Sequence, residues 1–436
     1  MRIYFIGIGG IGVSALAQYY LAKGHKVSGS DLVSSEITRF LQEKSIKVII
    51  RSGKSCRLGK SQNLIKGSDL IIYSPAVPDD HPELKLAKKL KIRCLSYPEA
   101  LGELTKKYFT IAVCGSHGKS TTASMLGLML IKANLDPTVI VGTRLKEFGN
   151  SNFRPGKGRY LVIEADEYKD SFLNYWPKMI VLTNIDKDHL DYFGSFENLI
   201  LSFDKFIGHL PVQGWLVVNK NNRLFRAQNL RSKVQYFSSR QKRDIQRIRK
   251  VLKIPGRHNI LNALAALTAA RLLGVSDKTC FEALAEYNGS WRRFEILKES
   301  PFVLVSDYAH HPSEVLATLR AAREKFKDKE IWCFFQPHQY QRTYYLWDDF
   351  VRSLREAPVD RLFVTDIYDV PGRENRKIKK AISSKKLVRA VNKKGVIYIK
   401  EKDILPFLKE KLNRGKVVMI MGAGDIYNLA EEIKKW

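Results

Sequence analysis

Two hydrophobic periods alternate along this sequence. Short runs of consecutive apolar residues are typical of strands buried on both faces of a sheet, and they are followed by stretches with the three-to-four-residue spacing of amphipathic helices. This alternation predicts an α/β fold built on mostly parallel sheets. The clearest runs are RIYFIGIGG, IAVCG, YLVIEAD, MIVLTNID and, in the last third of the chain, FVLVSDYA, IWCFFQPH, RLFVTDIY and VVMIMGAG.

The N-terminal segment predicts a β-α-β unit. A strand in 2–10 runs into GIGGIG, a helix is expected over 13–22, and a second strand, KVSGSD, ends at Asp31. Glycines at this spacing, followed by an acid, fit the dinucleotide-binding pattern G-x-G-x-x-G. Because a helix N-terminus recognises only phosphate charge, such a loop binds any diphosphate and supports NAD weakly. The candidate binding residues are Gly7, Gly9, Gly10, Gly12 and Asp31.

A second glycine-rich loop lies in IAVCGSHGKSTT, residues 111–122. Its glycines let backbone N–H groups approach phosphates, Lys119 supplies a point charge, and Ser120 offers a hydroxyl to Mg²⁺ at the start of a helix. Val113 stands where the general G-x-x-x-x-G-K-[ST] pattern has its first glycine, so a plain strand-turn-helix with a surface lysine is the alternative. The predicted triphosphate site comprises Gly115, Ser116, His117, Gly118, Lys119, Ser120 and Thr121.

Polar residues near the ends of two strands predict a magnesium site. Glu164 lies in the run YLVIEAD, and His189 follows MIVLTNID in the segment NIDKDH. Hard oxygen ligands suit Mg²⁺, and strand ends face the crevice in which α/β sheets bind ligands. A histidine is unusual among such ligands, and a lone histidine is more often structural. The candidate ligands are Ser120, Glu164 and His189, with Asp166, Glu167 and Asp188 as open alternatives.

Composition bounds the size and the surface of the protein. At 436 residues the chain is long enough for about three domains. Lysine and arginine number 74 against 44 acids, a formal net charge of +30. Such a charge invites a nucleic-acid hypothesis, but the basic residues recur throughout the chain and are densest at 240–253. We expect a solvated surface that steers anionic small molecules, with nucleic-acid or membrane-surface affinity as the alternative.

Cysteine usage and hydropathy favour a cytoplasmic protein. The five cysteines are scattered singly with no C-x-x-C, which argues against disulfides and structural zinc. No apolar run approaches the roughly 18 residues of a membrane span, and Met1 leads straight into a strand. We therefore expect neither a signal peptide nor membrane insertion.

An ordered series of motifs over the whole chain resembles the Mur ligase family. The resemblance implies a Rossmann-like UDP-substrate domain over 1–106, a central P-loop ATPase domain over 107–290, and a Rossmann-like domain over 291–436 that receives the amino acid. It also implies that the first glycine loop binds the UDP diphosphate, without NAD. The motifs are GIGGIGVSALA, GSHGKSTT, EADE, TNIDKDHLDYF, GRHNILN, RRFE, DYAHHPSEV and QPHQYQRT.

Within that family, the segments GIGG, DYAHHP and QPHQYQRT are most similar to the member that adds the first amino acid to a peptidoglycan precursor. The implied reaction uses ATP and Mg²⁺ to join L-alanine to the lactyl carboxylate of UDP-N-acetylmuramate through an acyl phosphate. The alternative within the family is a recycling ligase that attaches a preformed peptide to the same nucleotide sugar. We expect a monomer or weak homodimer with no nucleic-acid partner.

The resemblance also implies roles for individual residues. Lys119, Glu164 and His189 match positions that hold the ATP phosphates and the metals. Asn259 and Asn262 match positions that bind adenine, although from the residues alone they read as helix-capping residues. The remaining matches are Arg293 for the ATP phosphates, Asp307 for the ribose, Tyr308, His310 and His311 for alanine, and His338 with Arg342 for the muramoyl carboxylate and its acyl phosphate.

Four places depart from the family pattern. Ser116 and Ser120 replace the usual threonines and keep the hydroxyls, whereas Gln339 replaces an arginine and removes a cation near the substrate carboxylate. The stretch 236–255 is shorter than its equivalent and strongly basic, which predicts the loss of peripheral strands. DIYDVPGREN, residues 366–375, predicts an altered loop near the substrates.

Overall fold

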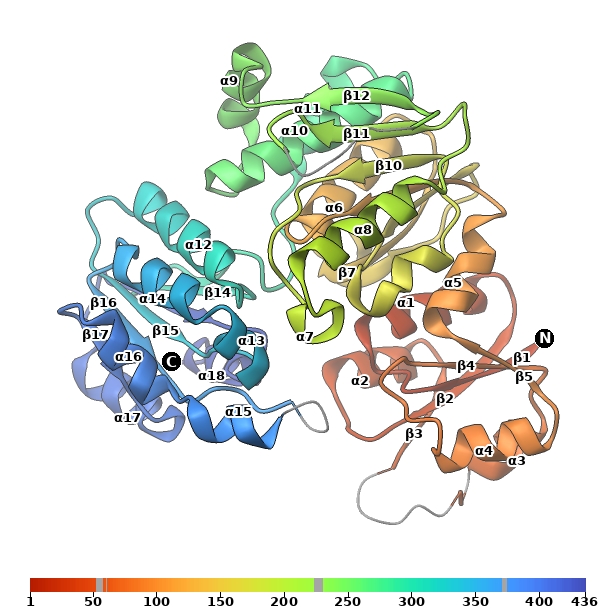
Figure 1. Ribbon diagram of the computed structural model, residues 1–436, viewed down its shortest axis with the longest axis horizontal. Helices are drawn as coiled ribbons and strands as arrows, with labels where there is room; N and C mark the ends of the chain where they lie inside the picture. Colours follow the sequence, from red (N-terminus) through yellow and green to blue (C-terminus); the bar gives the residue numbers. More distant parts are fainter. Residues whose placement is uncertain (52–57, 60, 223–229, 371–374) are drawn as a thin grey trace. The chain divides into compact units, whose positions relative to one another are not determined.

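The α/β architecture expected from the hydrophobic pattern is confirmed. In the computed structural model, which describes residues 1–51, 58–59, 61–222, 230–370 and 375–436, strands alternate with helices and form three sheets (Figure 1). Two of the sheets lie in one compact unit, which comprises Met1–Ile185, Ile200–Gln241 and Ala263–Glu286. The third lies in a second unit, which comprises Asp186–Leu199, Lys242–Asn262 and Tyr287–Trp436.

The N-terminal sheet is parallel throughout, with the Rossmann-like strand order β3-β2-β1-β4-β5. Its central strand β1 follows from the sequence, because the run IYFI is buried where both faces are covered. The first helix begins two residues earlier than expected, at Ile11. The elements are β1 (Arg2–Ile6), α1 (Ile11–Ala22), β2 (Lys26–Asp31), α2 (Glu36–Glu43), β3 (Lys47–Ile50), α3 (Ser61–Lys66), β4 (Leu70–Tyr73), α4 (Pro82–Lys89), β5 (Arg93–Ser96) and α5 (Tyr97–Thr105).

The central sheet has the order β12-β11-β10-β6-β9-β7-β8 and is parallel except for the pair β7 and β8. β6, which leads into the phosphate loop, lies between β10 and β9, so the carboxyl ends of the three strands meet at one edge. The elements are β6 (Phe109–Cys114), α6 (Lys119–Lys132), β7 (Thr138–Leu145), η1 (Lys146–Phe148), β8 (Ser151–Arg154), β9 (Tyr160–Glu164), η2 (Tyr168–Asn174), β10 (Met179–Leu182), α7 (Leu190–Phe193), α8 (Phe196–Ile207), β11 (Trp215–Asn219), β12 (Lys233–Phe237), α9 (Lys242–Val251), α10 (Arg257–Leu272) and α11 (Asp277–Glu286).

The C-terminal sheet has the order β13-β14-β18-β15-β16-β17, with only the β13–β14 pair antiparallel. Buried apolar clusters cover both of its faces, which explains why its strands read as unbroken hydrophobic runs. The elements are β13 (Glu295–Lys298), β14 (Val303–Asp307), α12 (Pro312–Lys325), β15 (Ile331–Phe335), α13 (Tyr340–Tyr345), α14 (Trp347–Glu356), β16 (Arg361–Val364), α15 (Arg376–Ala381), α16 (Ser384–Val391), β17 (Val396–Tyr398), α17 (Glu401–Lys411), β18 (Val417–Met421) and α18 (Tyr427–Ile433).

Two local expectations were wrong. Asn259 and Asn262 read from the residues alone as helix-capping residues, but α10 already begins at Arg257, so both lie within its first turns. The strand in MIVLTNID ends at Leu182, well before its acid Asp186, because the loop after β10 is recruited to brace the phosphate loop. The domain boundaries at 106/107 and 290/291 stay predictions, and residues 371–374 of the altered loop lie outside the described residues. Among the described helices, none is both long and apolar enough to cross a membrane.

Candidate active site

The loop after β6 has a backbone that requires glycine. Gly115 has φ +126° and Gly118 has φ +82°, both in the region that L side chains rarely adopt. A Cβ on Gly115 would lie 2.2 Å from Thr183 Oγ1. Gly118 immediately precedes α6, so the first N–H groups of that helix, which have no intrahelical acceptors, face the end of the loop. Ser120 and Thr121 lie in the first turn of α6 and are buried.

The same loop is braced by the segment that follows β10. His117 N donates to Asn184 Oδ1 at 3.0 Å, and Asn184 Nδ2 donates back to His117 O at 2.8 Å. Ser116 N donates to Asn184 O at 3.1 Å, and Thr183 Oγ1 donates to His117 O at 2.7 Å. Sequence reasoning missed this role of Thr183 and Asn184, for which the only signal was their place in TNID directly after a buried strand. The brace fixes the loop before any phosphate arrives.

Lys119 is held at the mouth of this loop. Its Nζ donates to Gly115 O at 2.7 Å and to Glu167 Oε2 at 2.8 Å. Burial works to lower the pKa of Lys119, but the carboxylates of Glu167, Asp166 and Glu164 outweigh it and raise the pKa. The ammonium therefore stays charged at neutral pH. Glu167, an open alternative among the metal ligands, is the counter-ion of this lysine in the structure.

Ser120 and Glu164 lie together at the carboxyl edge of the central sheet. Ser120 Oγ donates to Glu164 Oε2 at 2.8 Å, and Gly142 N on β7 donates to the same oxygen at 2.7 Å. Two hard oxygens side by side are the donor type that Mg²⁺ prefers, so the residues present fit the ion. Their role as ligands stays a prediction.

His189 belongs to the second unit and precedes the short helix α7. His189 has φ +53°, and its backbone N–H donates to Asp188 Oδ1 at 2.8 Å. Its ring Nε2 lies 3.7 Å from Asp188 Oδ2. The histidine is thus positioned by its neighbouring acid. Its role as a metal ligand also stays a prediction.

The N-terminal glycine loop is shaped by the end of β2. Gly9 N donates to Asp31 Oδ2 at 2.7 Å, and Gly7 N donates to Ser30 O at 2.9 Å. Gly10 precedes α1, and Gly12 lies in its first turn. The Asp31 carboxylate therefore holds the loop in place, which gives it a structural function besides the ligand binding predicted for it.

Arg342 forms a buried ion pair in the second unit. Its Nε lies 3.1 Å from Asp188 Oδ1, and both side chains are less than a tenth exposed. Burial works to raise the pKa of Asp188, but the Arg342 guanidinium holds it well below its usual range. His338 lies beside the pair, with its Nδ1 3.4 Å from Arg342 Nη1. The structure therefore brings together His338 and Arg342, the two residues predicted to hold the muramoyl carboxylate.

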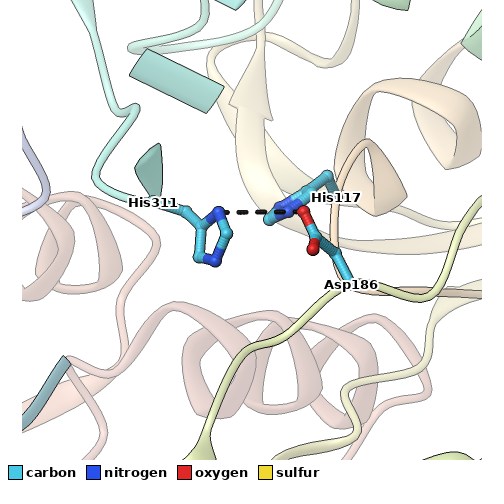
Figure 2. Close-up of side chains that lie close together, drawn as sticks. All are labelled: His117, Asp186 and His311. Carbon is cyan, nitrogen blue, oxygen red and sulfur yellow. Dashed lines mark ion pairs between the residues drawn. The ribbon is translucent and has the colours of Figure 1, made fainter. Parts of the chain in front are cut away.

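The histidines predicted to receive alanine are also in ordered positions. His311 Nε2 lies 2.8 Å from Lys187 O, and its Nδ1 lies 4.0 Å from Asp186 Oδ2 (Figure 2). His310 Nδ1 lies 3.0 Å from Tyr308 O. Burial, with the nearby Arg342, lowers the pKa of His310 to about 3, so this imidazole is neutral at physiological pH.

Glu314 was missed by sequence reasoning. It lies one helical turn after His310, with its Oε2 3.6 Å from His310 Nδ1, and its Oε1 lies 3.8 Å from Arg293 Nη1. The spacing of four residues in DYAHHPSEV was the available signal. Glu314 links the predicted alanine site to the arginine predicted to reach ATP.

The remaining predicted ATP contacts have backbone partners. Asp307 accepts from Phe294 N at 2.7 Å and from Ala309 N at 2.8 Å, and burial raises its pKa. Asn259 Nδ2 donates to Pro255 O at 2.7 Å, and Asn262 lies one turn further along α10. Asp307 thus shapes its own loop, and the roles of these residues toward ribose and adenine stay predictions.

A phosphate-binding loop with a buried, charged lysine on a parallel sheet defines a nucleotide-binding α/β protein. Three family models identify the family of the chain. "Mur ligase family, catalytic domain" matches residues 2–109, "Mur ligase middle domain" matches 113–270, and "Mur ligase, glutamate ligase domain" matches 292–424. The chain belongs to the Mur ligase family, which confirms the resemblance found in its motifs.

Within this family, the chain is similar over nearly its whole length to UDP-N-acetylmuramate–L-alanine ligases. The chain is 39% identical to the UDP-N-acetylmuramate–L-alanine ligase of Acetivibrio thermocellus, over 100% of this chain and 96% of the relative. It is 41% identical to the enzyme of that name from Caldicellulosiruptor saccharolyticus, over 99% and 98%. The crystal structure of UDP-N-acetylmuramate-alanine ligase from Thermotoga maritima matches with a TM-score of 0.79 at 26% identity, covering 100% of this chain and 98% of that one.

Proposed function

We propose that this chain uses ATP to join L-alanine to the lactyl carboxylate of UDP-N-acetylmuramate, an early step of peptidoglycan precursor synthesis. The proposal is supported by the full-length relatives that carry this activity in their names. The observation that carries it structurally is Lys119, whose ammonium is held at the mouth of a braced phosphate loop by Gly115 O and Glu167. A cation fixed there serves phosphoryl transfer.

The reaction has two steps. A carboxylate oxygen of the substrate attacks the γ-phosphorus of ATP and ADP leaves, which gives an acyl phosphate. The alanine amine then attacks the carbonyl carbon, loses a proton and expels inorganic phosphate. Lys119 offsets the charge of the transferred phosphoryl group, and Arg342 with His338 holds the carboxylate and its acyl phosphate.

Neutral His310 suits the amino-acid site. With a pKa lowered to about 3 it does not repel the alanine ammonium, and an uncharged imidazole nitrogen can accept a hydrogen bond from it. Tyr308 and His311 complete the assignment for alanine. Magnesium is assigned to Ser120, Glu164 and His189, and when bound it supplies positive charge to the ATP phosphates.

We assign the UDP moiety and ATP to two different glycine-rich loops. The Gly7–Gly12 loop and Asp31 bind the UDP moiety, and the ATP contacts comprise the phosphate loop with Asn259, Asn262, Arg293 and Asp307. We further assign the chain to the cytoplasm, as a monomer or weak homodimer without a nucleic-acid partner. Its domains are divided at 106/107 and 290/291.

Amino-acid selectivity tests the proposal. Purified protein is given ATP, Mg²⁺ and UDP-N-acetylmuramate with either L-alanine or the tripeptide L-alanyl-γ-D-glutamyl-meso-diaminopimelate. We expect ADP release and a product heavier by one alanyl residue with alanine alone. Turnover with the tripeptide and not with alanine would assign the chain to the recycling reaction. ATP turnover that depends on DNA or RNA instead would contradict both.

A further inference from the structure

An open surface cavity of about 560 Å³ lies on the first unit, away from the phosphate loop. Its lining includes Phe109, the first residue of β6, and Arg159, which directly precedes β9. The phosphate loop follows the opposite end of β6, after Cys114. A strand of this length spans roughly 17 Å, so the cavity is separate from the predicted triphosphate site.

The lining of this cavity is cationic. Lys23, Lys107, Lys157 and Arg159 contribute four positive charges, and no carboxylate is among the described lining residues. In the described part of the chain, none of the four side chains forms an ion pair with an acid. The nearby Asp136 carboxylate accepts from Lys157 N–H and is itself paired with Arg154. Four cations around an open cavity whose described lining holds no carboxylate attract anions.

Hydroxyl groups and a fixed guanidinium add directional donors. The hydroxyls of Tyr19 and Tyr108 lie 3.3 Å apart, and Lys23 Nζ lies 5.6 Å from the centre of the Tyr19 ring. Arg159 Nη2 donates to Tyr160 Oη at 2.8 Å, which orients its fork. Burial works to raise the pKa of Tyr108, but hydrogen bonds with Tyr19 and Lys23 lower it, as a positive environment requires.

We propose that this cavity binds a small polyanion of the di- or triphosphate class, at a site separate from the phosphate loop. Lysine point charges and an arginine fork are the groups that recognise phosphate oxygens, and the volume lies within the range of small-molecule sites. A nucleic acid or a lipid surface is a weaker match, because each is met by a basic surface that extends well beyond four cations. Lys107 and Tyr108 lie between α5 and β6, so a bound anion contacts the connection between the two sheets of this unit.

Calorimetric titration with sodium tripolyphosphate at low salt tests the site. The Lys119→Ala variant removes the cation of the phosphate loop, so binding there is suppressed. With UDP present to occupy the Gly7–Gly12 loop, we expect this variant still to bind one tripolyphosphate per chain. Adding Lys107→Gln and Lys157→Gln is expected to weaken that binding about tenfold, through the loss of two charge-assisted contacts. The matched pair Lys85→Gln and Lys89→Gln removes two exposed lysines of α4 and is expected to leave the affinity unchanged.

Several results would overturn the proposal. The first is that the Lys119→Ala variant does not bind tripolyphosphate. The second is that the cavity pair and the control pair weaken tripolyphosphate binding equally. Binding of a DNA duplex or of phosphatidylglycerol vesicles that depends on Lys107 and Lys157, without tripolyphosphate binding, would assign the cations to a macromolecule instead. The four lysines of the cavity pair and the control pair are exposed, and thermal unfolding of each variant, Lys119→Ala included, checks that it folds. Arg159→Gln provides an independent variant and is expected to weaken binding as well.

Discussion

At the scale of single residues, Lys119 and Glu167 show how a reactive group is kept charged while buried. The Glu167 side chain is 1% exposed, so removing Lys119 leaves a buried carboxylate without the cation that pairs with it. We expect Lys119→Ala to lose more than nine-tenths of ligation turnover and about 3 kcal/mol of stability. Steady-state kinetics and denaturant unfolding measure the two effects.

The double variant Lys119→Ala/Glu167→Gln separates the loss of turnover from the loss of stability. Neutralising the carboxylate is expected to restore most of the lost stability, because no uncompensated charge remains buried, and to restore none of the turnover. A folded Lys119→Ala protein that keeps more than a tenth of wild-type turnover would contradict the assignment of the phosphate loop.

Gln339 is one of the residues at which this chain departs from its family pattern. It has φ +73° and precedes α13, and neither arginine nor glutamate at this position relieves that backbone conformation. We predict that Gln339→Arg lowers KM for UDP-N-acetylmuramate by about tenfold, if the added cation recovers ~1.4 kcal/mol of binding to the carboxylate. Gln339→Glu is the matched control and is expected to raise KM. An unchanged or raised KM for the arginine variant would show that position 339 does not face the substrate.

At the scale of elements, two of the three predicted metal ligands, Ser120 and Glu164, lie at the carboxyl edge of the central sheet. A Cβ on Gly142 of β7 would lie 2.6 Å from Glu164 Oε2, the oxygen that Ser120 also contacts. Gly142→Ala is therefore expected to displace this carboxylate and to raise the Mg²⁺ concentration needed for half-maximal turnover, as Glu164→Gln and His189→Ala are. Mg²⁺ titrations of all three variants test this, and wild-type dependence in Glu164→Gln or His189→Ala would remove that residue from the site.

The start of α12 makes the second unit sensitive to acid. The pKa of His310 is lowered to about 3 from an ordinary value near 6.5, so between these pH values the unfolded chain binds a proton that the folded chain does not. Stability therefore falls as pH drops through this window, by about 2 kcal/mol at pH 5 from this group. His310→Gln is expected to reduce the fall in Tm between pH 7.5 and 5. A Tm profile parallel to wild type would contradict the neutral, buried imidazole.

Much of this element-scale picture could be predicted from the sequence. Strands of parallel sheets can be recognised in the sequence as unbroken apolar runs. The phosphate loop can be recognised by the glycines that its backbone requires, such as Gly115. The braces could not be predicted, because they join elements that only tertiary structure brings together: Asn184 holds a loop 67 residues away. Asp31 and Asp307 were read as ligand-binding acids, and only the fold shows that both accept backbone N–H groups. Spacing along the chain does not reveal such partners.

At the scale of the whole molecule, the charge of +30 is expected to act on substrate capture. ATP and UDP-N-acetylmuramate are both anions, and a positive field raises their encounter rate until salt screens it. We predict that kcat/KM falls as monovalent salt rises while kcat changes less. Equal salt dependence of kcat and kcat/KM would show that the charge does not steer substrates.

The proposed reaction requires the substrate carboxylate to become an acyl phosphate before alanine attacks. It is tested most directly by UDP-N-acetylmuramate carrying ¹⁸O in both oxygens of its lactyl carboxylate. During ligation one carboxylate oxygen stays in the amide and the other leaves with the phosphoryl group. ³¹P NMR of the released phosphate is therefore expected to show one ¹⁸O atom per phosphate formed, and unlabelled phosphate alongside ligated product would contradict the mechanism.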